Sequence, residues 1–169
     1  KGFTELSERL PGTEMIEMLN GYFGIAVATI QAHGGNILKF MGDGMFGYWQ
    51  GTSPAQRGQA VQAARKLALG LTHLPPEQQP LPAEDGLELR CGVGLHIGET
   101  AFGAVARGTR TALGDVVNMT FRIEALTREL GESILVSEPF LQGWDAGRIG
   151  FESVGQQPIS CLLYTSPSP

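Results

Sequence analysis

Cysteine is scarce in this chain of 169 residues, which has only Cys91 and Cys161. Two cysteines are too few for a disulfide framework, and Cys91 stands in a strand-like run where a buried, reduced thiol is expected. We therefore expect a reducing, cytosolic setting and a cytoplasmic location. Histidine is also rare, with three residues, and no second histidine or cysteine stands at ligand spacing, so a zinc site is not expected.

Long hydrophobic runs are missing as well, since none approaches the roughly 20 residues that a membrane span requires. We expect neither a signal peptide nor membrane contact in this segment. An excess of basic charge is also lacking, because the formal net charge is -5 and the pI is about 5.2. This balance argues against nucleic acid as the main partner, although a small anionic ligand can still bind locally.

The two ends of the chain do not fit its middle. The first residue, Lys1, is not methionine and already lies in a patterned segment, so we expect a longer parent protein. The stretch Cys161–Pro169 has no relation to the preceding pattern, and its codons can be written as a transposon-type sequencing adaptor. With 42% hydrophobic residues, the rest can bury one core. We expect one domain over 1–160, truncated at both ends, and a non-native tail over 161–169.

Hydrophobic periodicity predicts a helix from Glu14 to His33, with Thr13 as N-cap and Gly34–Gly35 as its end. A hairpin around Asp43 follows, and a second helix begins after Ser53–Pro54. A loop is expected over 73–86, followed by a strand over 87–97 with a glycine-rich face open to a helix or ligand. A short strand over 100–106 is expected to pair with it, and a polar loop over 107–114 follows. The last expected elements are a helix capped by Asp115 and ended by Gly131, a strand over 133–136, a helical turn over 138–141 and a strand starting at 148.

This order of elements indicates an α+β sandwich, with helices on one side of a mainly antiparallel sheet. Within it, Asp43 stands between Gly42 and Gly44 at the predicted hairpin tip. Glycines on both sides let a ligand approach the backbone, which makes Asp43 a metal candidate. Ordinary turn chemistry explains the same three residues and is the alternative.

A second group of candidates lies on the helix that follows Gly114. Asn118 and Arg122 are four residues apart and share a face that avoids the apolar stripe. An amide and a guanidinium on one face can orient a sugar or phosphate and stabilise phosphoryl charge. The alternative is a solvated face, with Arg122 paired to Glu124 or Glu129.

Six segments taken together resemble the class III adenylate and guanylate cyclase catalytic domain, of the bacterial adenylate cyclase type. The order and spacing of the six match that family over residues 1 to 155. They are Lys1-Gly-Phe-Thr-x-Leu-Ser7, Leu19-Asn-x-Tyr-Phe23, His33-Gly-Gly35, Lys39-Phe-x-Gly-Asp43, Gly92-x-Gly-x-x-x-Gly98-Glu99 and Gly114-Asp-x-Val-Asn-x-x-x-Arg122.

The resemblance implies a ferredoxin-like α+β core and a homodimer with active sites at the subunit interface. It also implies an adenylate cyclase that converts ATP to 3′,5′-cyclic AMP and pyrophosphate with two Mg²⁺ or Mn²⁺ ions per site. The implied roles are a metal ligand for Asp43, purine recognition for Lys39 and Thr111, ribose positioning and transition-state stabilisation for Asn118 and Arg122, and triphosphate contacts for Gly2, Phe3, Thr4 and Arg107.

The purine assignment has a physical rationale. Adenine presents an amino donor beside a ring-nitrogen acceptor, which the Lys39 ammonium and the Thr111 hydroxyl complement. Family members that read guanine typically carry an acidic residue at the lysine position. The resemblance therefore favours ATP, with Asp43 serving one active site of a symmetric dimer and Lys39 the other.

The chain departs from the family pattern in two places. The first metal aspartate of the family falls two residues before Lys1, and the phosphate-binding lysine of the last strand is absent after Pro158. We expect this fragment to be inactive and the parent, with its regulatory domains, to be a cyclase. The alternatives are a degenerate cyclase homology domain that binds a nucleotide or partner, and a guanylate or diguanylate-type cyclase.

Overall fold

The structure is a computed structural model that describes residues 7–70, 91–105, 109–159 and 161–166. The predicted loop over 73–86 and the start of the predicted strand over 87–97 lie outside the described residues. The helices are α2 (Gly12–Ala32), α3 (Pro54–Gly70), α4 (Asp115–Leu130), α5 (Glu138–Leu141) and α6 (Asp145–Arg148). The strands are β1 (Asn36–Met41), β2 (Gly44–Tyr48), β3 (Val93–Leu95), β4 (Ala101–Val105), β5 (Thr109–Leu113), β6 (Ile134–Ser137), β7 (Glu152–Gln157) and β8 (Cys161–Thr165).

The first long helix, α2, confirms the predicted helix and its end. Gly34 has a φ of 74°, the left-handed conformation that ends a helix at little cost for glycine. The predicted N-cap Thr13 is wrong, because the Pro11 carbonyl already accepts the Met15 amide at 3.1 Å and Thr13 lies inside the first turn. Within the described residues, no helix is both long and apolar enough to cross a membrane.

The second long helix, α3, begins at the predicted place with a capping box. The Ser53 hydroxyl accepts the Gln56 amide at 3.3 Å, and the Gln56 side-chain oxygen accepts the Ser53 amide at 3.1 Å. These two bonds satisfy amides that have no partner inside the helix.

The four-stranded sheet has the order β3-β6-β8-β7, with β3 and β6 parallel and the other pairs antiparallel. Its strand β6 is buried along its whole length. Ile134 and Val136 pack in the cluster that holds Ala60 and Val61 of α3, whereas Leu135 packs with Ile123 of α4. Alternate residues of a strand point to opposite faces, so α3 and α4 cover opposite faces of the sheet.

The α+β class is confirmed, but the expectation of helices on one side only is wrong. A strand that is apolar at consecutive positions, as β6 is, must be covered on both faces. The three consecutive apolar residues Ile134-Leu135-Val136 already indicated a strand covered on both faces. This pattern is stronger evidence than the order of elements, from which helices on one side were expected.

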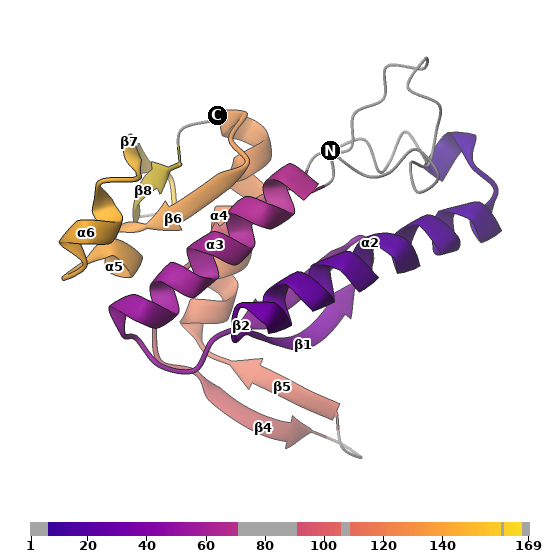
Figure 1. Ribbon diagram of the computed structural model, residues 1–169, viewed down its shortest axis with the longest axis horizontal. Coiled ribbons are helices and arrows are strands. Elements are labelled where there is room, and N and C mark those ends of the chain that lie inside the picture. The colour runs from indigo at the N-terminus through magenta and orange to yellow at the C-terminus, as the bar shows by residue number, and fades with distance from the viewer. Residues whose placement is uncertain (1–6, 71–90, 106–108, 160, 167–169) are drawn as a thin grey trace.

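The β4–β5 hairpin corrects two further predictions. Residues 101–105 pair with Thr109–Leu113 and not with the 87–97 segment, and the segment predicted as a polar loop contains β5. The hairpins β1–β2 and β4–β5 form two sheets of their own, and β4–β5 projects from the body at the bottom of the view (Figure 1). An exposed hairpin needs no apolar face, which explains why its polar threonines and arginine concealed it.

The last part of the chain also differs from expectation. Helix α6 runs through Arg148, and the strand predicted from residue 148 starts only at Glu152. Strand β8 lies between β6 and β7, with Leu163 and Tyr164 buried. It was not predicted, because the segment from residue 161 onward was interpreted as a non-native tail with no part in the fold. The non-native origin of 161–169 stays a prediction.

Arg57 of α3 joins the start of that helix to the end of α5. Its guanidinium donates to the carbonyls of Phe140 at 3.0 Å, Gln142 at 2.7 Å and Thr52 at 2.8 Å. We expect Arg57→Ala to lower the free energy of unfolding by about 1–2 kcal/mol, because three hydrogen bonds from a charged donor are lost, one of them to the part-buried Phe140 carbonyl. Urea unfolding measures this, with Lys66→Ala, an exposed cation of α3, as the control. Equal stability of the two variants would contradict it.

Candidate nucleotide site

The hairpin that carries Asp43 forms as predicted. Strands β1 and β2 pair antiparallel with Met41 opposite Gly44, which leaves Gly42 and Asp43 as the turn. Gly42 has a φ of 59°, which a residue with a Cβ adopts only at a cost. The turn thereby holds the Asp43 carboxylate at an exposed tip.

Lys39 stands on the side of this hairpin that faces α4. Its cross-strand neighbour is Phe46, whose ring centroid lies 5.4 Å from that of Phe121 in α4. The next residue, Phe40, packs on the other side, with its ring centroid 4.8 Å from that of Phe23 in α2. The exposed Lys39 side chain therefore lies on the α4 side of the hairpin.

Asn118 and Arg122 are both exposed on α4, whereas Val117 and Ile123 are buried. The prediction that they avoid the apolar stripe is confirmed. Neither forms an ion pair or side-chain hydrogen bond with another described residue, so the alternative of Arg122 paired to Glu124 or Glu129 is not observed there. The predicted N-cap Asp115 is wrong, since Gly114 takes that position with a φ of 147° and Asp115 is the first helical residue.

Thr111 is half-buried in β5, directly opposite Gly103 of β4. Side chains of directly opposed residues point to the same face of a hairpin. A Cβ built at Gly103 would meet no atom within 4 Å, so the space beside Thr111 is open. Strand β5 lies against β1, which places Thr111 and Lys39 on neighbouring strands.

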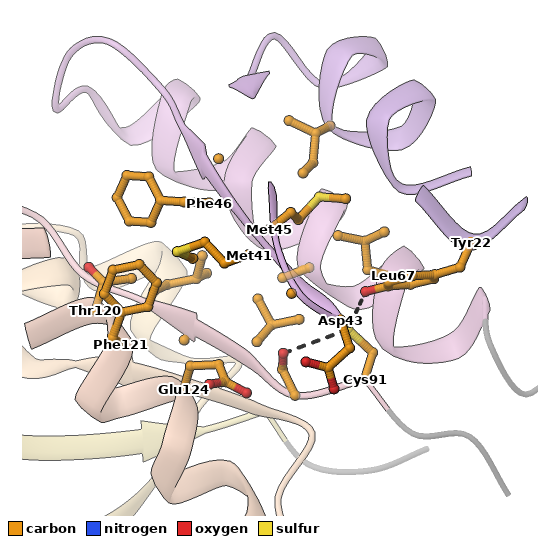
Figure 2. Close-up of a pocket in the computed structure, with 18 of the residues that line it drawn as sticks. Tyr22, Met41, Asp43, Met45, Phe46, Leu67, Cys91, Thr120, Phe121 and Glu124 are labelled. Carbon is orange, nitrogen blue, oxygen red and sulfur yellow. Dashed lines mark hydrogen bonds between the residues drawn. The ribbon is translucent and has the colours of Figure 1, made fainter. Parts of the chain in front are cut away.

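A cavity of about 420 Å³ extends from the Asp43 turn between β2 and β3. Figure 2 shows Asp43, Glu124, Cys91 and the Tyr22 hydroxyl at one end of it, with Phe46 and Phe121 further along. Lys39, Thr111, Asn118 and Arg122 do not line this cavity. Of the predicted site residues that the structure describes, it therefore takes in only Asp43.

Three titratable groups at this end of the cavity were not predicted as site residues. The Tyr22 hydroxyl and the Cys91 sulfur are 3.4 Å apart, and burial raises the pKa of both groups. Partial burial raises the pKa of Glu124, and the Asp43 charge adds to this shift. The sequence feature that could have indicated this cluster is Gly92-x-Gly94. A Cβ at Gly94 would lie 2.6 Å from the Glu124 amide nitrogen, so the glycine lets α4 approach the strand.

That approach of α4 confirms the prediction that the glycine-rich face lets a helix lie close to the strand. Gly98 makes a similar contact, since its Cβ would lie 3.1 Å from the Val116 side chain. The strand itself is shorter than predicted in its described part, because β3 covers only Val93–Leu95.

The carboxylates of Asp43 and Glu124 are hard oxygen donors of the kind that Mg²⁺ and Mn²⁺ prefer. Among the described residues, however, no group of three His, Cys, Asp or Glu side chains is placed to hold a metal ion. The described residues therefore supply part of a metal site and do not complete one. The predicted residues Gly2, Phe3, Thr4 and Arg107 lie outside the described part of the chain.

We expect this chain to bind Mn²⁺ weakly and through Asp43. Millimolar Mn²⁺ should broaden the backbone amide signals of Gly42 and Gly44, and Asp43→Asn should weaken that effect by at least about tenfold, because the charged donor is lost. Asp145→Asn, which removes an exposed carboxylate from α6, is the matched control. Equal broadening in the two variants would show that Asp43 is not the ligand.

Comparison with known proteins gives consistent matches. Residues 1–160 match the family described as adenylate and guanylate cyclase catalytic domain. "Adenylate cyclase 1" of Rhizobium meliloti is 32% identical over 139 residues, which are 80% of this chain and 21% of that protein. "Adenylate cyclase" of Anabaena cylindrica is 30% identical over 142 residues, 82% of this chain and 28% of that protein. The chain thus spans less than a third of either relative.

Two solved structures are similar to this chain over nearly all of it. A bacterial light-regulated adenylyl cyclase superposes with a TM-score of 0.80 at 28% identity, over 98% of this chain and 48% of that one. A guanylyl cyclase superposes with a TM-score of 0.75 at 26% identity, over 98% of this chain and 86% of that one. These matches include both nucleotide specificities.

Proposed function

The chain belongs to the adenylate and guanylate cyclase catalytic domain family, and on that basis we propose that its parent protein is an adenylate cyclase. The reaction is attack of the ribose 3′-oxygen of ATP on the α-phosphorus, which forms 3′,5′-cyclic AMP and releases pyrophosphate. The observation that carries this proposal is the pair Asn118 and Arg122, exposed on one face of α4 and free of partners among the described residues.

The proposed roles follow from the chemistry of each side chain. Arg122 donates to the phosphoryl oxygens as negative charge moves onto the leaving pyrophosphate, and Asn118 orients the ribose. Lys39 donates to the ring nitrogen of adenine, and Thr111 accepts from its amino group. The open space beside Thr111 at Gly103 gives a planar base room to approach.

The proposed site is completed by a second copy of the chain. Asp43 of the partner subunit faces the nucleotide held by Lys39, Thr111, Asn118 and Arg122, which gives two equivalent sites in a symmetric homodimer. Exposed apolar side chains on both hairpins support this association, since Phe40 is 51%, Phe102 46% and Leu113 63% exposed.

Two Mg²⁺ or Mn²⁺ ions, when bound, would stabilise the nucleophile and the leaving group. Of the described residues, Asp43 would contribute to holding them. The triphosphate contacts of Gly2, Phe3, Thr4 and Arg107 belong to the same proposal. So do the regulatory domains of the parent and its cytoplasmic location.

Guanylate cyclase activity is the second candidate, because a guanylyl cyclase is among the similar structures. Lys39, a hydrogen-bond donor that complements adenine, favours adenylate cyclase activity. The family match also favours both over a diguanylate-type cyclase.

The test is formation of cyclic nucleotide from ATP and from GTP, with Mg²⁺ and with Mn²⁺, by the 169-residue chain and by the intact parent. We expect cyclic AMP from the parent and none from the shorter chain. Formation of cyclic GMP from GTP in excess of cyclic AMP from ATP would select the guanylate candidate. Nucleotide binding by the parent without turnover would select the degenerate domain that acts as a binding module.

A further inference from the structure

A β-bulge in β1 determines which face of the hairpin carries Lys39. Up to Ile37 the register is regular, with Ile37 opposite Gly47, but the next paired residue is Lys39, opposite Phe46. The strand β1 therefore has one more residue than β2 at this place. Without that extra residue, Lys39 would lie opposite Met45 and on the other face. The bulge thus places Lys39 on the face that carries the Phe46 side chain.

The Phe46 ring connects this face of the hairpin to α4. Its centroid lies 5.4 Å from that of Phe121, and the two ring planes are inclined by 43°. Both side chains are half-buried. Tilted aromatic pairs at such a distance attract each other beyond the effect of the apolar area that they bury, and they prefer particular orientations. The contact therefore helps to define how the hairpin lies against the helix.

Phe121 stands beside the residues that we assign to the ribose and the phosphates. It directly precedes Arg122 in the chain, and it lies three residues after Asn118, which makes the side chains of Asn118 and Phe121 neighbours on the helix surface. Two residues further on, Ile123 is fully buried and packs with Leu135 of β6. Phe121 therefore extends from a part of α4 whose position is fixed by the core.

One ring contact thus links the groups proposed to hold the two ends of the nucleotide. Lys39, directly across from Phe46, would hold the base. Asn118 and Arg122, on the same helix as Phe121, would hold the ribose and the phosphates. Recognition of one nucleotide by both groups requires the correct spacing between them, because a hydrogen bond weakens steeply when its distance or angle is wrong.

We propose that Phe46 and Phe121 are positioning residues that determine how strictly the parent protein selects its purine. Their contact holds Lys39 at the distance from Asn118 and Arg122 at which its ammonium meets the ring nitrogen of adenine. Neither ring has to touch the nucleotide, because each acts through the side chains beside it. The role of the two rings rests on the function proposed above and adds to it two residues outside the set that binds the nucleotide.

The test is the ratio of kcat/KM for ATP to that for GTP in the intact parent with Phe46→Leu, with Phe121→Leu and with both changes. Leucine keeps an apolar side chain and removes the ring contact. We expect each single change to lower the ratio at least about threefold, mainly through a raised KM for ATP, as the loss of one aromatic pair implies. The double variant should show no further fall, because either change alone already removes the contact.

A loss of stability alone would not reproduce this pattern. A smaller fraction of folded protein lowers the rates with both nucleotides equally and leaves their ratio unchanged. Phe23→Leu is the matched control, since it removes the ring contact with Phe40 on the opposite face of the same hairpin and should keep the parental ratio. Phe121→Tyr retains the ring and should keep that ratio too.

An unchanged ratio in both leucine variants would overturn the proposal. Falls that multiply in the double variant would do the same, because they would mean that the two rings act independently. A failure of the proposed function looks different: the parent then forms no cyclic nucleotide, or Lys39→Glu leaves the ratio of the two substrates unchanged. Either of those results would overturn the function and, with it, the role of the two rings.

Discussion

Replacing Arg122 by alanine in the intact parent protein is expected to lower the rate of cyclic AMP formation by roughly 10²–10³-fold, the loss typical when one donor to developing charge is removed. Arg122 is exposed on α4, and the buried residues of that helix are elsewhere. The substitution should therefore leave the fold intact. Steady-state kinetics should show the loss mainly in kcat, with a small change in KM, because the interaction strengthens in the transition state.

Two further variants separate this role from a general effect of charge. Arg122→Lys keeps the cation but loses the planar pair of donors, so we expect an intermediate rate. Lys66→Ala removes an exposed cation from α3 and should retain full activity. Arg122→Ala with a normal kcat and a raised KM would mean that Arg122 only binds the substrate. An unchanged rate in all three variants would exclude Arg122 from the site.

The long helices and the first hairpin were predictable because each carries its own local signal. The helices α2, α3 and α4 show periodic apolar residues, and Gly34 and Gly131 end two of them in the left-handed conformation. Glycines on both sides of Asp43 predict the turn of the β1–β2 hairpin. Such features depend on neighbours within about four residues, so the sequence displays them.

The pairing of strands was less predictable, because it depends on residues far apart. Strand β3 pairs with β6 some forty positions later and not with its neighbour β4. Nothing local distinguishes those choices. The polar residues Thr109, Arg110 and Thr111 also concealed the second hairpin, because they give β5 little of the apolar alternation that marks a strand.

In the candidate site, too, features that depend on local spacing were predictable and features that depend on distant residues were not. Asn118 and Arg122 were predictable as a pair because helical spacing fixes their common face. The end of the cavity where Tyr22, Cys91 and Glu124 meet joins α2, the β3 segment and α4. Only the tertiary fold brings these elements together, and a lone tyrosine, cysteine and glutamate carry no shared pattern along the chain.

Lys39 should decide which purine the parent protein accepts. Replacing it by glutamate exchanges a pure donor for an acceptor, which matches guanine and opposes adenine. We expect the ratio of kcat/KM for ATP to that for GTP to fall by about 10²-fold or more, since a site that hydrogen-bonds its substrate strongly rejects an analogue with the wrong groups. Lys39 is exposed, and the packing of Phe46 against Phe121 should survive the change.

The control for this change is Lys39→Met, which removes the donor and adds no acceptor. It should lower activity with ATP and should not raise activity with GTP, so that only the glutamate variant gains a substrate. If both variants lose ATP activity equally and neither gains GTP activity, Lys39 serves to attract the anionic nucleotide and does not read its base. That outcome would move base recognition to Thr111, whose hydroxyl can donate as well as accept and thus distinguishes the purines poorly by itself.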